Sequence, residues 1–531
     1  MGKFNTKSEN KPSMATNYMG ENAFVLTAKE ELITTVMTTF LSDGYYENQQ
    51  EIVERIKEAI DKVDPLFVAK LAVYARTEGN LRSVSHLLAA LLADKVRGNE
   101  WAKNFFNTVV VRPDDMAEII ACYAKLHDVE ELSHVRPIPN AIKKAFKAKL
   151  EALDPYQIDK YKMNGHDINM RDLVNIFHPR RNEAFNRLMT GGKLTDLYDS
   201  KRLETTMSAS AEKAQEEGIT LDEAKGDAIR EVLNNIKGMP VMNMLRNLRN
   251  IILYCPEQYE LVVDKLTNEQ VIINSKQLPF RFVSAYQAVE KDVETNDKTR
   301  IAKTRILEAL EVALRISCKN IPVLEGKTAV LIDDSGSMRG DRGGSSRLSS
   351  FSSVTTAKIA HTFGGMMLHS QNDVYVGLFG DRLIDMPLKQ DMKIMDFINE
   401  SYELGDECGG ATEQGIFDFF KAHTDPDSER IDNVIVFSDC QIGSNASTNW
   451  FGLHGDRSAE FVNLFKEFRK VNPLCNVFVV NLRQYGETNV FHRSQRIFNI
   501  AGWSTSIFDL ISKNAIGMDA MIEAIENIKF N

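Results

Sequence analysis

The fold of the C-terminal part is decided by residues 327–338, which read KTAVLIDDSGSM. The first half of this stretch, up to Ile332, is a short apolar run of the kind that forms a buried parallel strand. The second half alternates acidic and hydroxyl side chains along a loop, beginning at Asp333. The chain therefore passes here from a core strand directly into a group of oxygen ligands.

Similar apolar runs recur downstream of this first strand. They cover residues 373–379, 433–438, 476–481 and 496–500. Segments with helical spacing separate them, at residues 353–370, 391–401, 413–423, 458–471 and 516–529. Strands that alternate with helices predict a doubly wound parallel sheet, and we assign this α/β domain to residues 326–531.

The oxygen-bearing side chains after the first strand belong to a larger predicted set. It comprises Asp333, Ser335 and Ser337, then Thr412 in a loop that opens a helix, and Asp439 at the end of a later strand. The carboxyl ends of parallel strands meet at one edge of a sheet, so these residues are expected to lie together. Two carboxylates and three hydroxyls suit Mg²⁺ or another divalent cation.

A second interpretation of this edge is a hydroxyl-rich helix start with a hydrogen-bonded aspartate and no metal. Under either interpretation, the motif contains no His or Cys that could act as a base or a nucleophile. We therefore expect a binding site rather than an enzyme.

Residues 21–325 have a different pattern, in which almost every long segment has helical spacing. Ile52, Ile56 and Ile60, for example, form one apolar stripe. The segments 66–74 and 84–92 are apolar nearly all round, which indicates buried helices. Many helices joined by short turns predict a HEAT-like helical array, although no clean repeat period is visible.

Composition gives further expectations about the N-terminal residues, membrane spans and the cysteines. The first 20 residues are polar and rich in turn formers, so we expect a disordered arm. No run of 18 or more apolar residues occurs, which argues against a membrane span. The N-terminus lacks the basic residues followed by an apolar run that mark a secretory signal. The six cysteines are scattered and form no CxxC pair. These features predict free thiols in a reducing, cytoplasmic compartment.

Charge is unevenly distributed along the chain. The net charge is −10, which argues against a protein that coats nucleic acid over its whole surface. Residues 136–193 nevertheless contain 12 Lys and Arg against 6 Asp and Glu. A local basic surface of this kind is compatible with RNA binding, and equally with a solvated helix face.

Two family resemblances follow from these motifs. The five oxygen ligands resemble the metal-ion-dependent adhesion site of von Willebrand A domains. The helical half resembles the TROVE module of Ro autoantigens and of telomerase and vault components. The segments that carry the TROVE resemblance are residues 66–96, 160–166, 171–179, 239–248 and 278–280.

The resemblance to Ro proteins implies a ring of helical repeats whose ends are clasped by the A-type domain. It implies a small noncoding RNA as partner, with Y-like RNA on the outer surface and single-stranded 3′ ends of misfolded RNA in the central hole. It further implies a monomer without DNA or membrane partners, and it makes an exoribonuclease such as polynucleotide phosphorylase a candidate protein partner.

The residues expected to contact RNA are all basic or histidine. Lys160 and Lys162 match basic positions before the Asn-Gly turn of the family, and His178 matches a histidine before proline. Arg171 lies two helical turns before His178. Lys143 and Lys144 are included because they lie in the basic stretch. Such side chains would contact phosphates, and Tyr161 and Phe177 beside them are candidates for stacking on bases. Phe177 also fits a buried position on its helix, which is the usual place of a helical aromatic side chain.

Met163 stands where other Ro proteins place an arginine, which bears on the Y-RNA mode more than on the single-strand mode. The leading hypothesis is a non-enzymatic RNA-binding ring for RNA stability or quality control. The alternative is a metal-dependent protein-docking adaptor with incidental RNA binding. A third possibility, hydrolysis by the pair of Asp333 and Asp439, is disfavoured because no general base accompanies them.

Overall fold

The structure of the protein is a computed structural model. It describes residues 14–16, 22–38, 49–79, 81–129, 137–198, 207, 210–234, 236–275, 277, 279–319, 321, 323–340, 355–389, 391–409, 414–440, 457–482, 488–489, 496–501 and 517–530.

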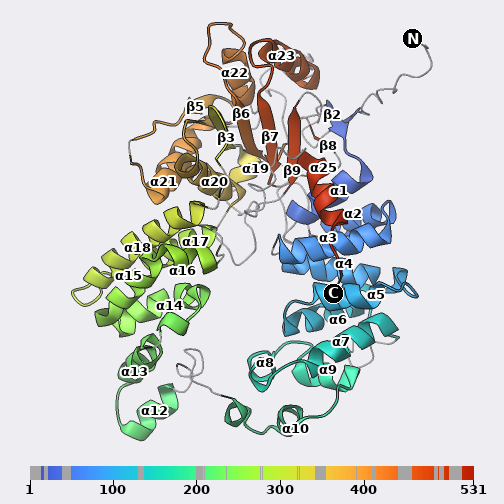
Figure 1. Cartoon of the computed structure of the whole chain (residues 1–531), viewed down its shortest axis with the longest axis vertical. Helices are drawn as coiled ribbons and strands as arrows, with labels where there is room; N and C mark the ends of the chain where they lie inside the picture. Colours follow the sequence, from blue (N-terminus) through green and yellow to red (C-terminus); the bar gives the residue numbers. More distant parts are fainter. Residues whose placement is uncertain are drawn as a thin grey trace.

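The first helical column of the structure runs downward from the sheet domain (Figure 1). Its helices begin at residues that favour a helix start. Asp64, for example, directly precedes Pro65, the first residue of its helix, and its side chain accepts a hydrogen bond from the backbone N–H of Phe67. The stripe of Ile52, Ile56 and Ile60 is buried as predicted. The elements are α1 Ala28–Thr38, α2 Gln49–Asp61, α3 Pro65–Thr77, α4 Arg82–Lys95, α5 Ala102–Val109, α6 Pro113–Leu126, α7 Asn140–Glu151, α8 Pro155–Lys160, α9 Met170–Phe177, α10 Glu183–Thr190 and the short η2 Thr195–Leu197.

The second helical column leads back up to the sheet domain (Figure 1). Consecutive helices pack against each other, as α12 does on α13 and α17 on α18. The elements are α12 Ser210–Glu217, α13 Leu221–Leu233, η3 Ile236–Gly238, α14 Val241–Tyr254, η4 Pro256–Gln258, α15 Tyr259–Thr267, α16 Glu269–Ser275, α17 Pro279–Asp292 and α18 Arg300–Cys318. The chain thus makes one circuit, as expected for a helical ring.

The C-terminal part contains a six-stranded sheet in the order β5-β4-β3-β6-β7-β9. Five strands are parallel and β5 runs antiparallel at the edge, which confirms the predicted α/β fold but adds a three-residue strand that the sequence pattern did not indicate. The strands are β3 Thr328–Asp333, β4 Val374–Phe379, β5 Leu383–Asp385, β6 Asn433–Ser438, β7 Asn476–Asn481 and β9 Ile497–Ala501.

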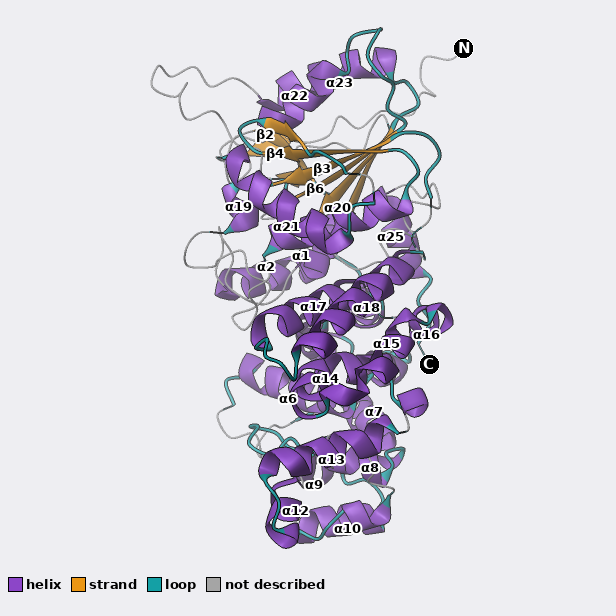
Figure 2. Cartoon of the chain, turned by 90° about the vertical axis from the view of Figure 1, so that its left-hand side faces the viewer, coloured by secondary structure: helices purple, strands orange, loops and turns teal. Residues whose placement is uncertain are grey.

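Helices cover both faces of this sheet, as a doubly wound fold requires (Figure 2). Val330 and Ile332 of β3 belong to a core shared with one layer of helices and with the helical half, whereas Ala329 and Leu331 belong to the core of the other layer. The first layer contains α20 Thr356–Ser370, α21 Ile394–Gly405 and α25 Gly517–Glu526, and the second contains α22 Gln414–Ala422 and α23 Arg457–Val471. The short elements α19 Gly336–Arg339 and η5 Asp406–Cys408 follow β3 and α21.

The sheet domain contacts both ends of the helical circuit. At one end, α25 packs on α1 and α3, and α1 also touches β9. At the other end, α17 and α18 pack on α20, and the buried Glu311 of α18 accepts hydrogen bonds from the backbone N–H groups of Ile394 and Met395 at the start of α21. These contacts produce the clasp that the resemblance implied.

The prediction of a disordered arm at residues 1–20 is wrong for the part of this segment that the structure describes. Residues Met14–Thr16 form strand β1, which pairs with β2, Asn22–Val25, and β2 in turn pairs with β8, Thr488–Asn489. The polar composition concealed β1, although its partner β2 follows it directly. The partner of β2 on its other side, β8, comes from more than 460 positions later, beyond any local pattern.

Two expectations from composition can be compared with this fold. All six cysteines are free thiols, as predicted. Within the part of the chain that the structure describes, no helix is both long and apolar enough to cross a membrane.

Candidate functional site

The predicted metal edge lies at the carboxyl ends of β3 and β6. These strands are parallel neighbours, with Ile332 paired to Phe437, so Asp333 and Asp439 come from the same edge of the sheet. Both aspartates are fully buried, and Ser335 and Ser337 are nearly so. The hydroxyls of these two serines are 3.2 Å apart. Four of the five predicted ligands therefore share one buried edge, while Thr412 lies outside the described residues.

The electrostatics of this edge fit a cation. Burial raises the pKa of Asp333 well above its ordinary value, and the neighbouring negative charge of Asp439 raises it further. Asp333 accepts hydrogen bonds from the Ser335 backbone and the Ser438 hydroxyl, as the metal-free interpretation also requires. Hard oxygen donors around a buried carboxylate pair are the chemistry that Mg²⁺ prefers. The described residues hold no cluster of three or more His, Cys, Asp or Glu for a metal, so any cation here would depend on the hydroxyls.

Asp334, next to the candidate ligands, belongs to a different network. Its Oδ1 accepts from Nη1 of Arg339 at 2.5 Å and lies 2.9 Å from Nε2 of His361. Nδ1 of His361 is 2.8 Å from the Ser401 hydroxyl. Ser401, His361 and Asp334 thus form a chain of polar contacts, but all three are buried. The carboxylate of Asp334 is also paired with Arg339. This network fixes the loop after β3 against α20 and α21 and offers no nucleophile to a substrate.

The basic residues of the helical half come from α7 to α10, which pack together. Phe146 of α7 and Phe177 of α9 meet edge to face at 5.3 Å, and the backbone N–H of Arg180 bonds to Glu151 at the end of α7. Lys143 and Lys144 lie exposed on α7. Phe177 is buried, so the interpretation of this residue as part of the helical core is confirmed, and the alternative of base stacking is not supported.

Lys160 and Lys162 differ in their surroundings although they are two residues apart. Lys160 is exposed at the end of α8, with its ammonium 5.5 Å from the ring of Tyr156 and 5.9 Å from that of Tyr161. Lys162 forms an ion pair with Asp159. The guanidinium of Arg112, the residue just before α6, lies 5.3 Å from the Tyr161 ring. The sequence could not indicate this neighbour because it lies about fifty positions earlier.

Arg171 and His178 occupy the two ends of α9. Nε of Arg171 donates to the backbone carbonyl of Leu188 at 2.9 Å, which ties α9 to α10. His178 is exposed, ends the helix with a φ of 47° and donates its backbone N–H to Val174. Left-handed backbone here explains why a histidine before proline stops the helix. Both residues therefore have structural contacts in addition to any contact with RNA.

Sequence reasoning missed a second basic site on α14 and α17. Arg246 and Arg281 both have exposed surface. The protein packed around the guanidinium of Arg281 removes part of its water and lowers its pKa, and the positive charge of Arg246 lowers that pKa further. The Phe280 ring lies 5.0 Å from the Arg281 guanidinium. The charge count along the chain could not reveal this pair because helix packing brings the two arginines together.

Comparison with known proteins was made on sequence and on fold. Residues 7–229 and 178–321 match the model of the TROVE domain. A stretch of 307 residues is 22% identical to telomerase protein component 1 of Rattus norvegicus, covering 45% of this chain and 12% of that protein. A stretch of 204 residues is 26% identical to the RNA-binding protein RO60 of Caenorhabditis elegans, covering 36% of this chain and 30% of that protein.

The chain therefore spans less than a third of the length of either relative. Among solved structures, the crystal structure of the Ro (RSR) protein of Deinococcus radiodurans matches with a TM-score of 0.54 at 14% identity. The match covers 92% of this chain and 100% of that one. At this identity the likeness concerns the fold, and it extends over the helical circuit and the sheet domain together.

Proposed function

The chain belongs to the TROVE-domain family, and from this premise we propose that it is an RNA-binding scaffold without catalytic activity. Its ligands are small noncoding RNAs: structured, Y-like RNA on the outer surface and single-stranded 3′ ends of misfolded RNA in the centre of the helical circuit. Its role is RNA stability or quality control. The nematode relative's name, which describes an RNA-binding protein, supports this assignment.

One observation carries the proposal: exposed basic side chains lie on packed helices within the segment that matches the TROVE domain. Lys143, Lys144 and Lys160 have exposed side chains on α7 and α8. Flexible lysines on a rigid helical surface supply phosphate contacts without fixing the base sequence. Because the net charge of −10 argues against binding over the whole surface, the proposal requires a local basic surface of this kind.

Filter binding of a small RNA with a single-stranded 3′ tail, measured over a salt series, tests this proposal. We expect saturable binding whose logarithmic affinity falls linearly with the logarithm of salt concentration. The double variant Lys160→Glu, Lys162→Glu should bind more weakly with a shallower slope. Lys389→Glu, whose side chain is 61% exposed on the sheet domain, is the matched control. Equal binding of tailed RNA and blunt duplex would overturn the single-strand part.

We further propose that the edge formed by Asp333, Ser335, Ser337, Thr412 and Asp439 holds Mg²⁺ or another divalent cation. The buried pair of carboxylates supports this, because their mutual repulsion is relieved by a positive charge. When bound, the ion would neutralise the pair and offer an open position to an acidic group of a partner. The residues themselves orient the loop after β3 and keep its oxygens together.

This edge also supports the second candidate function, a metal-dependent adaptor that docks proteins and binds RNA only incidentally. The two candidates differ in which half of the chain carries affinity. If Asp333→Ala removes capture of an acidic peptide while the Lys160→Glu, Lys162→Glu variant leaves RNA binding unchanged, the adaptor replaces the RNA scaffold.

A further inference from the structure

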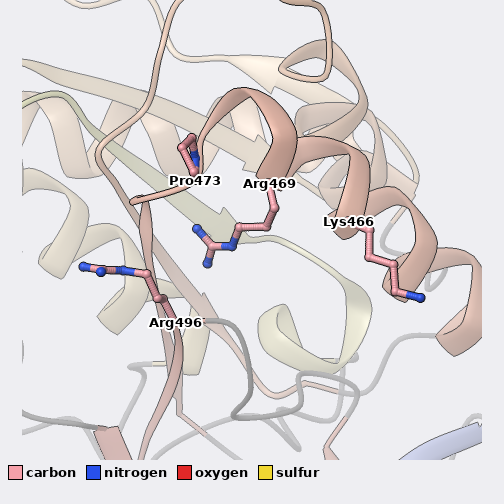
Figure 3. A pocket seen from close by; sticks show the side chains of 4 residues that line it. All are labelled: Lys466, Arg469, Pro473 and Arg496. Atoms are coloured by element: carbon pink, nitrogen blue, oxygen red, sulfur yellow. The ribbon is translucent and has the colours of Figure 1, made fainter.

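A shallow cleft of about 260 Å³ lies on the sheet domain, lined by Lys466, Arg469, Pro473 and Arg496 (Figure 3). Lys466 and Arg469 lie one turn apart on α23, Pro473 follows that helix, and Arg496 directly precedes β9. The cleft therefore adjoins the amino ends of β7 and β9, at the sheet edge opposite to the one that carries Asp333. It is separate from both sites described above.

Hydrogen bonds hold both arginines of the cleft in place. Arg469 donates through Nη1 to the carbonyls of Asn472, at 3.2 Å, and Cys475, and its guanidinium lies 4.6 Å from the Phe465 ring. Arg496 donates through Nε and Nη2 to Oδ1 of Asn476, at 3.0 and 2.7 Å. The amide acceptor fixes the side chain of Arg496 without neutralising its charge.

The charges in the cleft repel each other. Burial lowers the pKa of Arg469, and the positive charge of Arg496 lowers it further. In the described part of the chain, neither Lys466 nor Arg496 forms a salt bridge, whereas the neighbouring Lys470 pairs with Glu467 at 2.6 Å. The fixed guanidinium of Arg496 and the ammonium of Lys466, with no carboxylate among the residues that line the cleft, favour an anion from outside.

We propose that this cleft binds a phosphate group. Nη1 of Arg496, which makes none of the bonds to Asn476, can donate to a phosphate oxygen. The exposed Lys466, whose ammonium points away from Arg469 in Figure 3, has a flexible stem that can turn toward a ligand. The cleft is smaller than a typical site for a whole organic ligand, so the remainder of a larger molecule would stay outside. The phosphate belongs either to an RNA or to a free phosphate ion.

The site is tested on the full chain by calorimetric titration with inorganic phosphate, and with acetate at equal ionic strength. We expect phosphate to bind and acetate to bind at least about tenfold more weakly. Lys466→Gln with Arg496→Gln should lower phosphate affinity by about tenfold or more. Lys470→Gln, on the same helix but outside the cleft, should match the parent. Arg469 is left intact because it packs on Phe465. Equal binding of the two anions, or an unchanged double variant, overturns the proposal.

The source of the phosphate is distinguished by short RNAs with and without a 5′ phosphate, titrated into the Lys160→Glu, Lys162→Glu chain. Competition between RNA and inorganic phosphate identifies RNA as the source, through its end if only the phosphorylated RNA competes. Binding of the inorganic ion without such competition identifies free phosphate. Because the inorganic titration does not involve the helical half, failure of this site leaves the proposed RNA function intact, and the reverse also holds.

Discussion

Lys29 and Glu526 are 497 positions apart in the sequence, and their side chains form an ion pair of 2.6 Å. Lys70 donates to the backbone carbonyl of the same glutamate. The chain then continues to Phe530, whose ring lies 5.8 Å from Trp101 and 5.6 Å from Phe105. The last residues of the sheet domain are thus attached to the first helices, and they close the circuit.

The closure should depend on the aromatic contact more than on the ion pair. Lys29 and Glu526 are 38% and 50% exposed, and exposed ion pairs contribute at most about 1 kcal/mol. Removing a buried phenylalanine ring costs about 3–5 kcal/mol, so the half-buried Phe530 should contribute about 2 kcal/mol. We expect Phe530→Ala to lower the free energy of unfolding in urea more than Lys29→Ala does. Equal losses, or a larger loss in Lys29→Ala, would contradict this order.

Much of this fold could be predicted from local patterns because those patterns match the local structure. The runs that became β3, β4, β6, β7 and β9 were visible as apolar segments, and the helix stripes predicted their buried faces. Pairings between distant segments left no such signal. The pairing of β2 with β8 and the contact of Arg112 with Tyr161 depend on neighbours that come from elsewhere in the chain.

The candidate sites show the same division. Asp333 and Asp439 could be placed together because adjacent parallel strands bring their carboxyl ends to one edge. The cleft at Arg469 and Arg496 could not be predicted, because its cations come from a helix and from the approach to a strand, and no motif links the two.

The buried carboxylate of Asp115 should be essential for the stability of the helical half. It lies 2.9 Å from Nη2 of Arg76 and 2.9 Å from Nε2 of His86, and it accepts the backbone N–H of Arg112. Breaking a buried charged pair costs about 3–5 kcal/mol because the remaining charge loses its partner. We expect Asp115→Asn to lower the free energy of unfolding by this amount. Asp61→Asn, which removes an exposed pair with Lys95, should change it by about 1 kcal/mol or less.

The contribution of the Asp115 carboxylate should also make the free energy of unfolding depend on pH in acid. Burial alone would raise the pKa of Asp115, but hydrogen bonds from His86 and the Arg112 backbone, with the charge of Arg76, outweigh it and hold the pKa well below its ordinary value. A lowered folded-state pKa contributes stability that is present above about pH 4 and is lost as the pH falls toward the folded value. Unfolding free energies between pH 5 and about 2 should therefore fall more steeply in the parent than in Asp115→Asn. Parallel pH profiles would be inconsistent with this role.

A substitution at Asp333 should have opposite effects on thermal stability, relative to the parent, without and with the proposed cation. Without a metal, Asp333→Asn removes repulsion from Asp439 and should melt at or above the temperature of the parent. With Mg²⁺ at about 100 times its dissociation constant, the parent should gain about 2.7 kcal/mol, whereas the variant should gain nothing. Thermal unfolding in chelator and in Mg²⁺ measures both. Asp373→Asn, at an exposed position, should respond to Mg²⁺ as the parent does. A parent that is insensitive to divalent cations would exclude the site.

Single substitutions should show that Lys160 and Lys162, which have the same role in the sequence-based prediction, contribute unequally to RNA affinity. Lys162 already pairs with Asp159, so RNA must compete with that carboxylate for its charge. The ammonium of Lys160 lies near two tyrosine rings and forms no ion pair with any residue that the structure describes. We expect Lys160→Ala to reduce affinity for tailed RNA more than Lys162→Ala does, and to lower the magnitude of the salt slope by about one phosphate contact. Asp159→Asn, which frees Lys162, should raise affinity. Filter binding at several salt concentrations measures all three variants. A larger loss in Lys162→Ala, with no gain in Asp159→Asn, would mean that the ion pair itself positions the lysine for RNA.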